Sequence, residues 1–600
     1  MTNHDVASLK HAERNVWLDI LKAFAILAVV FYHLGVLPYG YLGVDLFLVI
    51  NGFLITQSIM KSYTQKRSFS YISFMLKRIV RLWPLVLFAS AVSLAVGYFT
   101  MLPDDLENLG ESVVAANCFM NNVLACITTK NYWDVVNNYK PLMHTWYLGV
   151  VMQCYVVFPL FFMVPYKFVK NKTAFAKVVY RVLFVITALS LLLYVLPTFS
   201  AAQKFYYVPF RFFEIGVGAL TAFWAVNSKN IFLKKYAWLF AVVILAIFIL
   251  PLSFISAAVK LLLVAAASSV CLLYSELPTT LHTPSAQIRG VLSKIGTMSY
   301  SIFIWHQVVF ALYRYAVRAA FTALDYAVVL LLTALLSIVS YTWLEQGIFK
   351  PNNKKSTGAI WVLSAVLFVV TTGLGLQLYR IGGIVRDVPE LGISKQERNR
   401  GVHAAYNDKI YKMNTDFEND GRIKVFVVGN SFGRDWVNVM LESSMKDNLD
   451  ISYAFSLPDF ETYTARVQSA DYIFWVGIPT AEEEAYLHRN MKPEAELYGV
   501  GTKNYGECNG NIYNKRSRSD YFEQRAAIMT NILEDYQKEK TYWADHYVDF
   551  MAPIIDAENT VPVFSDEHTF ISQDCRHLTQ NGAKFYAGIL DMESIFKKEE

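Results

Sequence analysis

The sequence predicts a polytopic α-helical membrane domain of about eleven spans, followed by a smaller α/β domain outside the membrane. The 600-residue chain is 54% hydrophobic and only 17% charged, whereas an ordinary globular chain is roughly 25% charged. Its apolar residues gather in blocks of about 20, the length that a helix needs to cross a bilayer. This composition excludes a disordered chain and argues against a purely soluble enzyme. The net charge of +5 is too small to indicate nucleic-acid binding.

The eleven expected spans lie between residues 17 and 378. The seventh and eighth are separated only by Pro251 and its neighbours, which either turn the chain tightly or kink one bent span. The spans cover residues 17–37, 42–60, 83–101, 143–164, 179–197, 206–226, 236–251, 254–274, 298–316, 324–345 and 358–378.

The loops predict the orientation of these spans. Lysine and arginine gather before the first span and after the second, fourth, sixth, eighth and tenth, while the other loops are nearly free of them. Because basic loops stay in the cytoplasm, the amino terminus is expected inside. Eleven crossings then carry the rest of the chain to the outer face of the cytoplasmic membrane. A separate signal peptide is not expected, because the first span follows a polar tail and lacks a small-residue cleavage pattern.

Three regions follow from this pattern: a membrane domain (residues 1–378), a polar extracytoplasmic linker (379–421) and an α/β domain (422–600). No internal repeat or low-complexity tract is visible.

Within the last region, apolar runs and helical patterns alternate. Ile423–Gly429 and Tyr472–Ile478 are continuous apolar runs that contain or end in glycine, which is typical of buried parallel strands. Phe522–Glu539 and the stretch after Leu578 are expected to be amphipathic helices. The alternation predicts a parallel sheet covered by helices.

Four of the six cysteines fall in regions expected outside the membrane. Cys118 and Cys126 lie in one outer loop, and Cys508 and Cys575 lie in the α/β domain. An oxidising compartment favours disulfides between these pairs, and four free thiols are the alternative. No cysteine spacing predicts a metal site.

Several ionisable residues lie inside the expected spans, where they are costly and need a partner or a purpose. Lys22 and His33 are eleven residues apart in the first span, so they share one helix face at a distance of about 16 Å along the axis. Histidine accepts a proton near neutral pH, which favours a pathway or active site over a structural ion pair. A structural ion pair is an equally good interpretation for Arg211 with Glu214 and for Glu345. The other polar residues of the set are Asp19, Asp45, Asn51, His144 and His306.

The first span and five later segments resemble the membrane acyltransferase-3 family, whose signature is Arg or Lys, ten residues, then His. The resemblance covers roughly residues 14–350 in the correct order. One departure is that the family usually has glutamate where this chain has Val151 or Met152. The segments are WLDILKAFAILAVVFYH (Trp17–His33), YLGVDLFLVINGFLIT (Tyr41–Thr56), FMLKRIVRLWP (Phe74–Pro84), HTWYLGVVMQCYVVFP (His144–Pro159), YSIFIWHQ (Tyr300–Gln307) and YTWLEQGIF (Tyr341–Phe349).

The resemblance implies transfer of an acyl group, usually acetyl from acetyl-CoA, to a sugar hydroxyl of an envelope glycan. It places Lys22 and His33 in the core site, with His33 as general base or transient acyl carrier. Arg78 and Arg81 are then candidates for binding the coenzyme phosphates, because arginine forks bind phosphate bidentately. The alternative for both arginines is the ordinary positive charge of a cytoplasmic loop.

A second candidate site lies in the α/β domain. The strand ending at Gly429 runs directly into Asn430 and Ser431, and a serine at such a strand-to-helix turn is exposed above the sheet. Asp574 and His577 come near the end of the chain. A serine needs a histidine to take its proton, and a carboxylate to orient that histidine. The three residues therefore predict a nucleophilic site.

This pattern resembles the SGNH (GDSL-like) fold, with Gly429-Asn430-Ser431 in the first block and Asp574 to His577 in the last. The usual Gly-x-Asn of the third block is replaced by Gly477-Ile478-Pro479. A convincing glycine of the second block is not identified. A degenerate domain that binds glycan without chemistry is the alternative.

Together the two sites favour an O-acyltransferase that relays acetyl from cytoplasmic acetyl-CoA, without a metal, to an extracytoplasmic glycan, with Ser431 as an acyl-enzyme on the way. A transporter or flippase with a glycan-binding outer domain is the main alternative, although no inverted repeat supports it. An esterase that removes acetyl groups is the third.

Overall fold

The computed structural model describes residues 15–64, 69–128, 137–169, 171–227, 231–274, 286–348, 354–397, 402–418, 420–457 and 459–597. Parts of the basic loops that predict the orientation lie outside these ranges. The chain divides into two units, each described here by itself. The first comprises Met1–Val96, Glu111–Tyr313 and Ala320–Gly375, and the second comprises Gly97–Gly110, Arg314–Ala319 and Leu376–Glu600.

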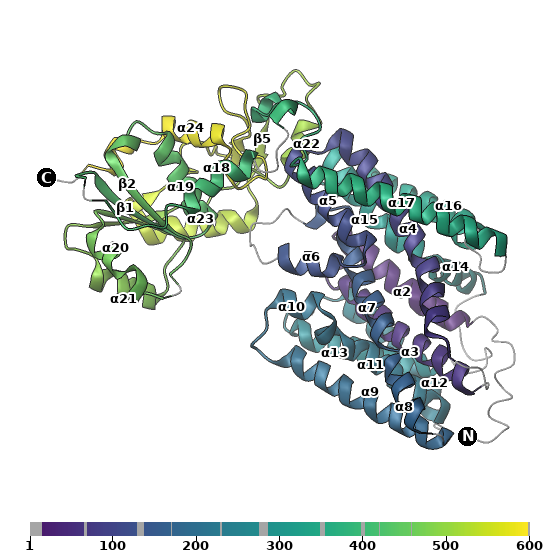
Figure 1. Cartoon of the computed structure of the whole chain (residues 1–600). Helices are drawn as coiled ribbons and strands as arrows, with labels where there is room; N and C mark the ends of the chain where they lie inside the picture. Colours follow the sequence, from purple (N-terminus) through teal and green to yellow (C-terminus); the bar gives the residue numbers. More distant parts are fainter. Residues whose placement is uncertain are drawn as a thin grey trace. The chain divides into compact units, whose positions relative to one another are not determined.

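The first unit is a helical bundle (Figure 1). Seven of its described helices or helix pairs are long and apolar enough to cross a membrane, or eight if the bent pair α14–α15 is one span. The main helices are α2 (Val16–His33), α3 (Gly43–Thr64), α4 (Tyr71–Thr100), α7 (Trp146–Val157), α8 (Leu160–Phe168), α9 (Lys172–Val195), α11 (Val208–Asn227), α12 (Ile231–Ile249), α13 (Ala257–Tyr274), α14 (Ala286–Thr297), α15 (Ser299–Ala316), α16 (Ala323–Val339) and α17 (Lys354–Arg380).

Each of the eleven expected spans coincides with helix, but the number of crossings is not established. The fourth is divided between α7 and α8, which count together as one apolar segment, Met143–Phe168. The chain breaks at Pro251, so α12 and α13 are separate helices, each with a shorter apolar stretch. The structure therefore supports a multi-pass membrane protein and leaves the exact count of eleven a prediction.

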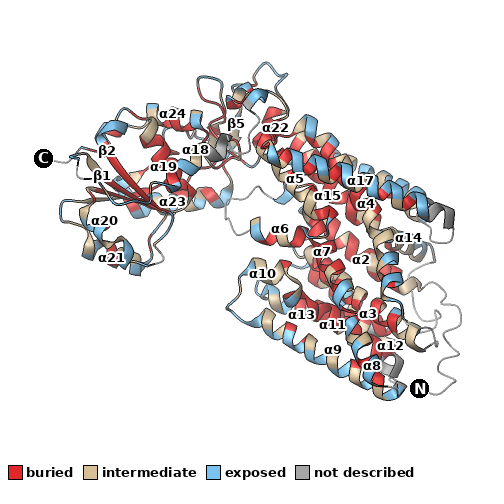
Figure 2. Ribbon diagram, in the orientation of Figure 1, coloured by how far each residue is buried: buried red, intermediate tan, exposed pale blue. Residues whose placement is uncertain are grey.

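The outer faces of several helices are apolar and exposed. Helix α9 exposes Phe184, Leu189 and Leu192, and α17 exposes Val362 and Val369. Figure 2 shows this exposure along α9 and α17, against a buried bundle interior. Exposed apolar surface of this extent is what a helix presents to lipid, because a soluble protein would bury it.

The second unit contains the predicted parallel sheet. Its order is β2-β1-β3-β4-β6, and every neighbouring pair is parallel. This is the doubly wound arrangement, in which ligands bind at the carboxyl ends of the strands. The strands are β1 (Ile423–Val428), β2 (Leu449–Ala454), β3 (Tyr472–Val476), β4 (Glu496–Val500) and β6 (Tyr547–Val548).

Both predicted strands are present, and so is the helix after Leu578, which is α24 (Gln580–Ile589). The helix expected over Phe522–Glu539 was wrong in its first half. Arg525–Ala527 instead forms strand β5 and pairs antiparallel with β7 (Thr560–Pro562), and α23 covers only Thr530–Trp543. Pairing with a distant strand outweighed the local helical pattern, as tertiary context commonly does.

Part of the predicted linker is ordered against the α/β region. Helix α18 (Val402–Tyr411) packs on α19 (Ser431–Glu442). Asn438 donates a hydrogen bond to Asn407, and Tyr406 donates one to Glu442. The segment therefore belongs to the same packed unit as the sheet.

All six cysteines lie within the described residues, and no disulfide joins any two of them. Neither expected pair, Cys118–Cys126 or Cys508–Cys575, is formed. In the first pair, Cys118 is exposed whereas Cys126 is buried in α6 (Asn121–Thr128), so the two thiols occupy different surroundings.

Candidate active site

The turn between β1 and α19 presents Ser431. Asn430 caps the helix, because its side chain accepts a hydrogen bond from the Phe432 N–H at 2.9 Å. Gly429 has φ of +143°, and a Cβ there would lie 2.4 Å from the Cβ of Val476. Only glycine suits both the backbone conformation and the close packing. The turn therefore fixes Ser431 as the first residue of α19.

Ser431, His577 and Asp574 form one hydrogen-bonded row. The Ser431 Oγ lies 2.7 Å from Nε2 of His577, and Nδ1 of His577 lies 2.5 Å from Oδ2 of Asp574. The backbone N–H of His577 also donates to Asp574 at 2.8 Å. This geometry gives each residue the place that a nucleophile, a general base and an orienting carboxylate require.

The surroundings of Asp574 keep its carboxylate charged. Burial alone would raise the pKa of Asp574, but His577 and the backbone N–H groups of His577 and Arg576 lower it well below the ordinary value. A carboxylate that stays ionised holds the proton of His577 on Nδ1, which leaves Nε2 free to accept the serine proton.

The N-terminus of α19 supplies donors for a developing oxyanion. The first N–H groups of a helix lack partners inside the helix and carry its positive dipole end. Directly after the neighbouring strand β3, Gly477 has φ of +75°, and its carbonyl accepts a hydrogen bond from the indole of Trp543 at 2.8 Å. Proline at position 479 leaves this segment without the usual asparagine, so the backbone at Ser431 is the best donor for the oxyanion.

The sequence analysis missed a buried ion pair close to the hydrogen-bonded row of Ser431, His577 and Asp574. Lys503 Nζ lies 3.0 Å from Oδ2 of Asp435, and both side chains are fully buried. Asp435 also accepts a hydrogen bond from the N–H of Leu578, the residue after His577. Burial alone would raise the pKa of Asp435, but Lys503 and Arg434 lower it. The pair therefore anchors the segment that carries the histidine.

We expect Asp435→Asn to lower the free energy of unfolding of the second unit by about 3–5 kcal/mol, because it leaves the Lys503 ammonium buried without its carboxylate. Chemical unfolding of the full chain, followed by tryptophan fluorescence, measures the loss. Because the folded pKa of Asp435 is lowered, its contribution is full above the unfolded value of about 4 and disappears as the pH falls through the folded value. The double variant with Lys503→Met should recover part of the loss; equal instability would contradict the pairing.

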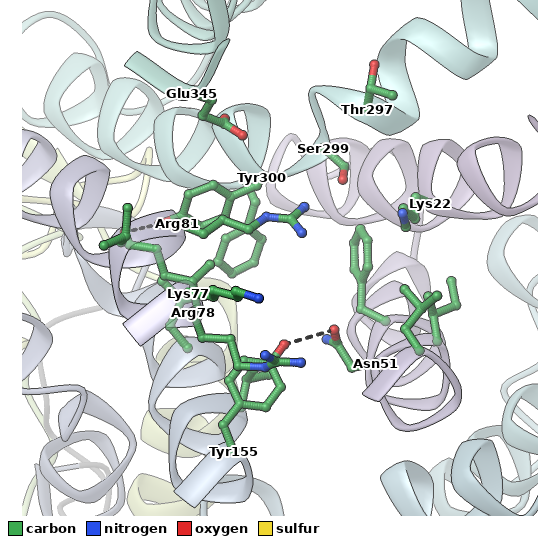
Figure 3. A pocket seen from close by; sticks show the side chains of 18 of the residues that line it. Lys22, Asn51, Lys77, Arg78, Arg81, Tyr155, Thr297, Ser299, Tyr300 and Glu345 are labelled. Carbon is green, nitrogen blue, oxygen red and sulfur yellow. Dashed lines mark hydrogen bonds between the residues drawn. The ribbon is translucent and has the colours of Figure 1, made fainter. Parts of the chain in front are cut away.

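The membrane unit contains a second candidate site, a cavity of about 900 Å³. Figure 3 shows that Lys77, Arg78 and Arg81 point into it from α4, across from Lys22 on α2. Four cationic side chains facing one space favour an anionic ligand. Lys22, Arg78 and Arg81 are residues that the sequence analysis singled out, and Lys77 is one that it missed.

Hydrogen bonds and an ion pair hold the polar lining of this cavity. Lys22 lies 3.6 Å from Asp19. Asn51 donates to the Tyr147 hydroxyl at 2.6 Å and accepts from Tyr155 at 3.3 Å. Asn51 is thereby connected to Tyr155, whose ring centroid lies 5.1 Å from Cζ of Arg78.

The remaining wall comes from irregular helices. Glu345 lies on a π-helical segment, Ser340–Ile348, and accepts a hydrogen bond from Ser301. Helices α14 and α15 bend by 68° between Thr297 and Ser299, and both of these residues line the cavity. Interruptions of this kind are frequent at functional sites in helical proteins.

A cluster of three histidines adjoins the cavity. The rings of His33 and His144 each lie 5.3 Å from the ring of His306. Phe303 lines the cavity and packs on His144 at 5.0 Å. His306 Nδ1 lies 2.7 Å from the carbonyl of Phe303, which leaves its Nε2 as the acceptor nitrogen. Phe303 therefore connects the lining of the cationic cavity with the histidine cluster.

Lys22 and His33 thus belong to neighbouring places rather than to one contact. Lys22 lines the cavity, whereas His33 is the last residue of α2 and lies in the histidine cluster. By contrast, Arg211 is buried with Asp45 and Glu214 at 2.5 and 3.1 Å. That network lies outside the cavity lining and ties helices α3 and α11 together.

The sequence comparison identifies the class of protein to which this helical bundle belongs. Residues 15–342, more than half of the chain, match the acyltransferase-3 family, described as "Acyltransferase domain". The chain belongs to this family.

Curated relatives carry more specific names. The chain is 28% identical over 301 residues to "Peptidoglycan O-acetyltransferase OatA" of Listeria monocytogenes, covering 48% of each chain. It is 26% identical over 379 residues to "O-acetyltransferase OatA" of Staphylococcus aureus (59% of this chain, 61% of the relative). It is 27% identical over 351 residues to "Putative peptidoglycan O-acetyltransferase YrhL" of Bacillus subtilis (55% and 54%). The chain thus spans about half to three-fifths of these relatives. No solved structure matches it significantly.

Proposed function

We propose that this chain transfers an acetyl group from acetyl-CoA to hydroxyl groups of an envelope glycan, and that the glycan is peptidoglycan. The observation that carries the proposal is the hydrogen-bonded Ser431–His577–Asp574 row in a chain whose other half belongs to an acyltransferase family. The names of the relatives support the acetyl group and the acceptor. The parallel sheet and the serine at its edge support an SGNH-like fold for the second unit.

The cationic cavity is the proposed donor site. Arg78 and Arg81 hold the phosphates of the coenzyme, because guanidinium forks match phosphate oxygens. Lys22 faces them from α2 and orients the thioester end (Figure 3). The wider lining is largely apolar and accommodates the pantetheine arm.

The next step of the transfer takes place at the histidine cluster. His33 serves either as proton acceptor or as transient acetyl carrier. As carrier, a ring nitrogen bonds to the acetyl carbon, the carbon–sulfur bond breaks, and the coenzyme leaves as its thiol with the imidazole proton. The nearby His306, whose Nε2 is an acceptor, can relay that proton from the imidazole to the sulfur of the departing thiol.

Ser431 completes the transfer on the glycan side. His577 takes the Oγ proton as Ser431 bonds to the acetyl carbon, and returns that proton to the departing group. The glycan hydroxyl then attacks the serine ester and gives its proton to His577, which passes it back to Oγ as the ester bond breaks. The product is an acetylated sugar and a regenerated serine.

The second unit supports the proposed orientation. It contains Gly97–Gly110 and Arg314–Ala319 as well as Leu376–Glu600. Tyr315 donates a hydrogen bond to Asp105 at 2.6 Å, and Asn514 donates one to the carbonyl of Thr100 at 2.9 Å. In an eleven-span chain, the third, ninth and eleventh spans all end on the same side. That shared side is the proposed extracytoplasmic face.

The proposal is tested in sealed proteoliposomes that contain the full chain. Acetyl-CoA with a labelled acetyl group is supplied on the side of the cavity, and peptidoglycan glycan strands on the other. Mass spectrometry should find labelled acetyl esters on the glycan only when both are present. Movement of glycan without acetylation would instead identify a transporter, and release of free acetate from acetylated glycan would identify an esterase.

We expect Arg78→Gln and Arg81→Gln each to raise the half-saturating concentration of acetyl-CoA about tenfold, through loss of a charge-assisted phosphate contact. The rate at saturating donor should change less. Arg181→Gln is the matched control, because Arg181 is an exposed arginine on α9 outside the cavity. If the half-saturating concentration is the same in all three variants, Arg78 and Arg81 do not bind the coenzyme and only contribute the positive charge of a cytoplasmic loop.

A further inference from the structure

Two exposed aromatic residues, Tyr411 and Phe455, lie on the β2 side of the turn that presents Ser431. Tyr411 is 41% exposed and Phe455 is 54% exposed. Their ring centroids lie 6.5 Å apart at an interplanar angle of 45°. Adjacent exposed aromatic side chains form an apolar patch, and such patches commonly mark binding sites.

The position of Phe455 follows from the register of the sheet. Ala454 pairs with Val428 at the carboxyl ends of β2 and β1, and the Gly429 N–H donates to the Ala454 carbonyl at 2.9 Å. Phe455 is the next residue along the chain. It therefore leaves the sheet directly beside the turn that presents Ser431.

Tyr411 reaches the same place through Tyr453. The two tyrosine rings lie 5.9 Å apart, and the Tyr453 hydroxyl lies 2.9 and 3.0 Å from the carbonyl oxygens of Gly429 and Asn430. The N–H of Tyr453 donates to the carbonyl of Met413, two residues after Tyr411. The buried Tyr453 thus contacts Tyr411 on one side and the turn that presents Ser431 on the other.

A charged side chain, Arg434, interacts with Tyr411. Burial alone would lower the pKa of Arg434, but Asp435 and Tyr411 raise it. Arg434 is 9% exposed and pairs with Asp435 at 3.0 Å. Its ion pair holds the guanidinium close to Tyr411, so it steadies one edge of the exposed ring.

We propose that Tyr411 and Phe455 form an acceptor subsite, on which a sugar ring of the glycan stacks while its hydroxyl approaches Ser431. This inference rests on the proposed function and specifies how its acceptor is held. The acetyl group is too small to need two large rings, whereas the C–H faces of a pyranose ring match an aromatic face. The tilt between the rings suits consecutive sugars of one strand, which do not lie in one plane.

The test uses the full chain in detergent, with p-nitrophenyl acetate as donor, so that acetyl enters at Ser431 without the membrane site. The acceptor probe is a tetrasaccharide of alternating N-acetylglucosamine and N-acetylmuramic acid. The variant is Tyr411→Ala combined with Phe455→Ala. Phe522→Ala is the matched control, because Phe522 is also 41% exposed but stacks on His568 at 4.2 Å instead.

We expect the double variant to raise the KM for the tetrasaccharide about tenfold. Hydrolysis of p-nitrophenyl acetate without acceptor should change much less. Tyr411→Trp with Phe455→Trp should restore the KM. An unchanged KM, or a parallel fall in hydrolysis and transfer, would overturn the subsite.

A binding measurement separates this inference from the proposed function. Saturation-transfer NMR of the tetrasaccharide is recorded with Ser431→Ala, which cannot form the acyl-enzyme. Signals that disappear when Tyr411 and Phe455 are also replaced support the subsite, even if the wild-type chain fails to acetylate glycan. Signals that persist overturn it.

Discussion

Replacing Ser431 by alanine should abolish ester turnover by the second unit. We expect a fall of about a thousandfold or more in hydrolysis of p-nitrophenyl acetate and in glycan acetylation, because no other group is hydrogen-bonded to Nε2 of His577 in the described row. Covalent labelling by a fluorophosphonate probe should be lost at the same time. Rates at saturating substrate, and labelling followed by mass spectrometry, measure both effects.

Ser443→Ala provides the matched control for this loss. Ser443 follows the carboxyl end of the same helix and is buried, and its hydroxyl donates to the carbonyl of Met440 and accepts from the N–H of Met445. Its variant should keep labelling and turnover. If Ser431→Ala retains glycan acetylation while losing the probe, the serine is not on the path of transfer, and the acetyl group passes to the glycan from the membrane site.

Replacing His33 should stop the membrane step and spare the serine step. We expect His33→Ala to reduce glycan acetylation from acetyl-CoA by about a hundredfold to ten-thousandfold, the usual contribution of a positioned acid–base group. Transfer from p-nitrophenyl acetate to glycan should persist, because that donor reaches Ser431 directly. Both reactions can be followed by mass spectrometry of the same glycan.

His33→Gln separates chemistry from packing. Glutamine keeps much of the volume and the hydrogen bonding of histidine, but it cannot accept a proton near neutral pH. An equal loss in both variants assigns a chemical role to the imidazole. Recovery of activity in His33→Gln would reduce His33 to a packing partner of His306, whose ring lies 5.3 Å away.

Local patterns predicted most of the fold. The apolar blocks predicted the membrane helices, and the continuous runs at Ile423 and Tyr472 predicted buried parallel strands. Strand β5 was not predictable, because Arg525–Ala527 is stabilised by pairing with residues 35 positions away. The number of crossings was not fixed either, since α12 and α13 contain only short apolar stretches.

The candidate sites were predictable only in part. The serine and the late Asp–His pair stand in recognisable motifs, and the structure brings them within hydrogen-bonding distance. Lys503 and Asp435 carry no motif, because their meaning depends on a buried contact between distant segments. Likewise, helical spacing places Lys22 and His33 on one helix face. It does not reveal that Lys22 lines the cavity whereas His33 lies in the histidine cluster.

Phe303 also has a consequence for the energy supply of the cell. Its ring packs on that of Tyr147 at 5.3 Å, and both aromatic side chains line the cavity. Apolar rings of this kind raise the cost of moving hydrated protons and ions past them. Under the proposed function, such a passage would hand over an acetyl group by exchange of covalent bonds while it keeps the electrochemical gradient across the bilayer intact.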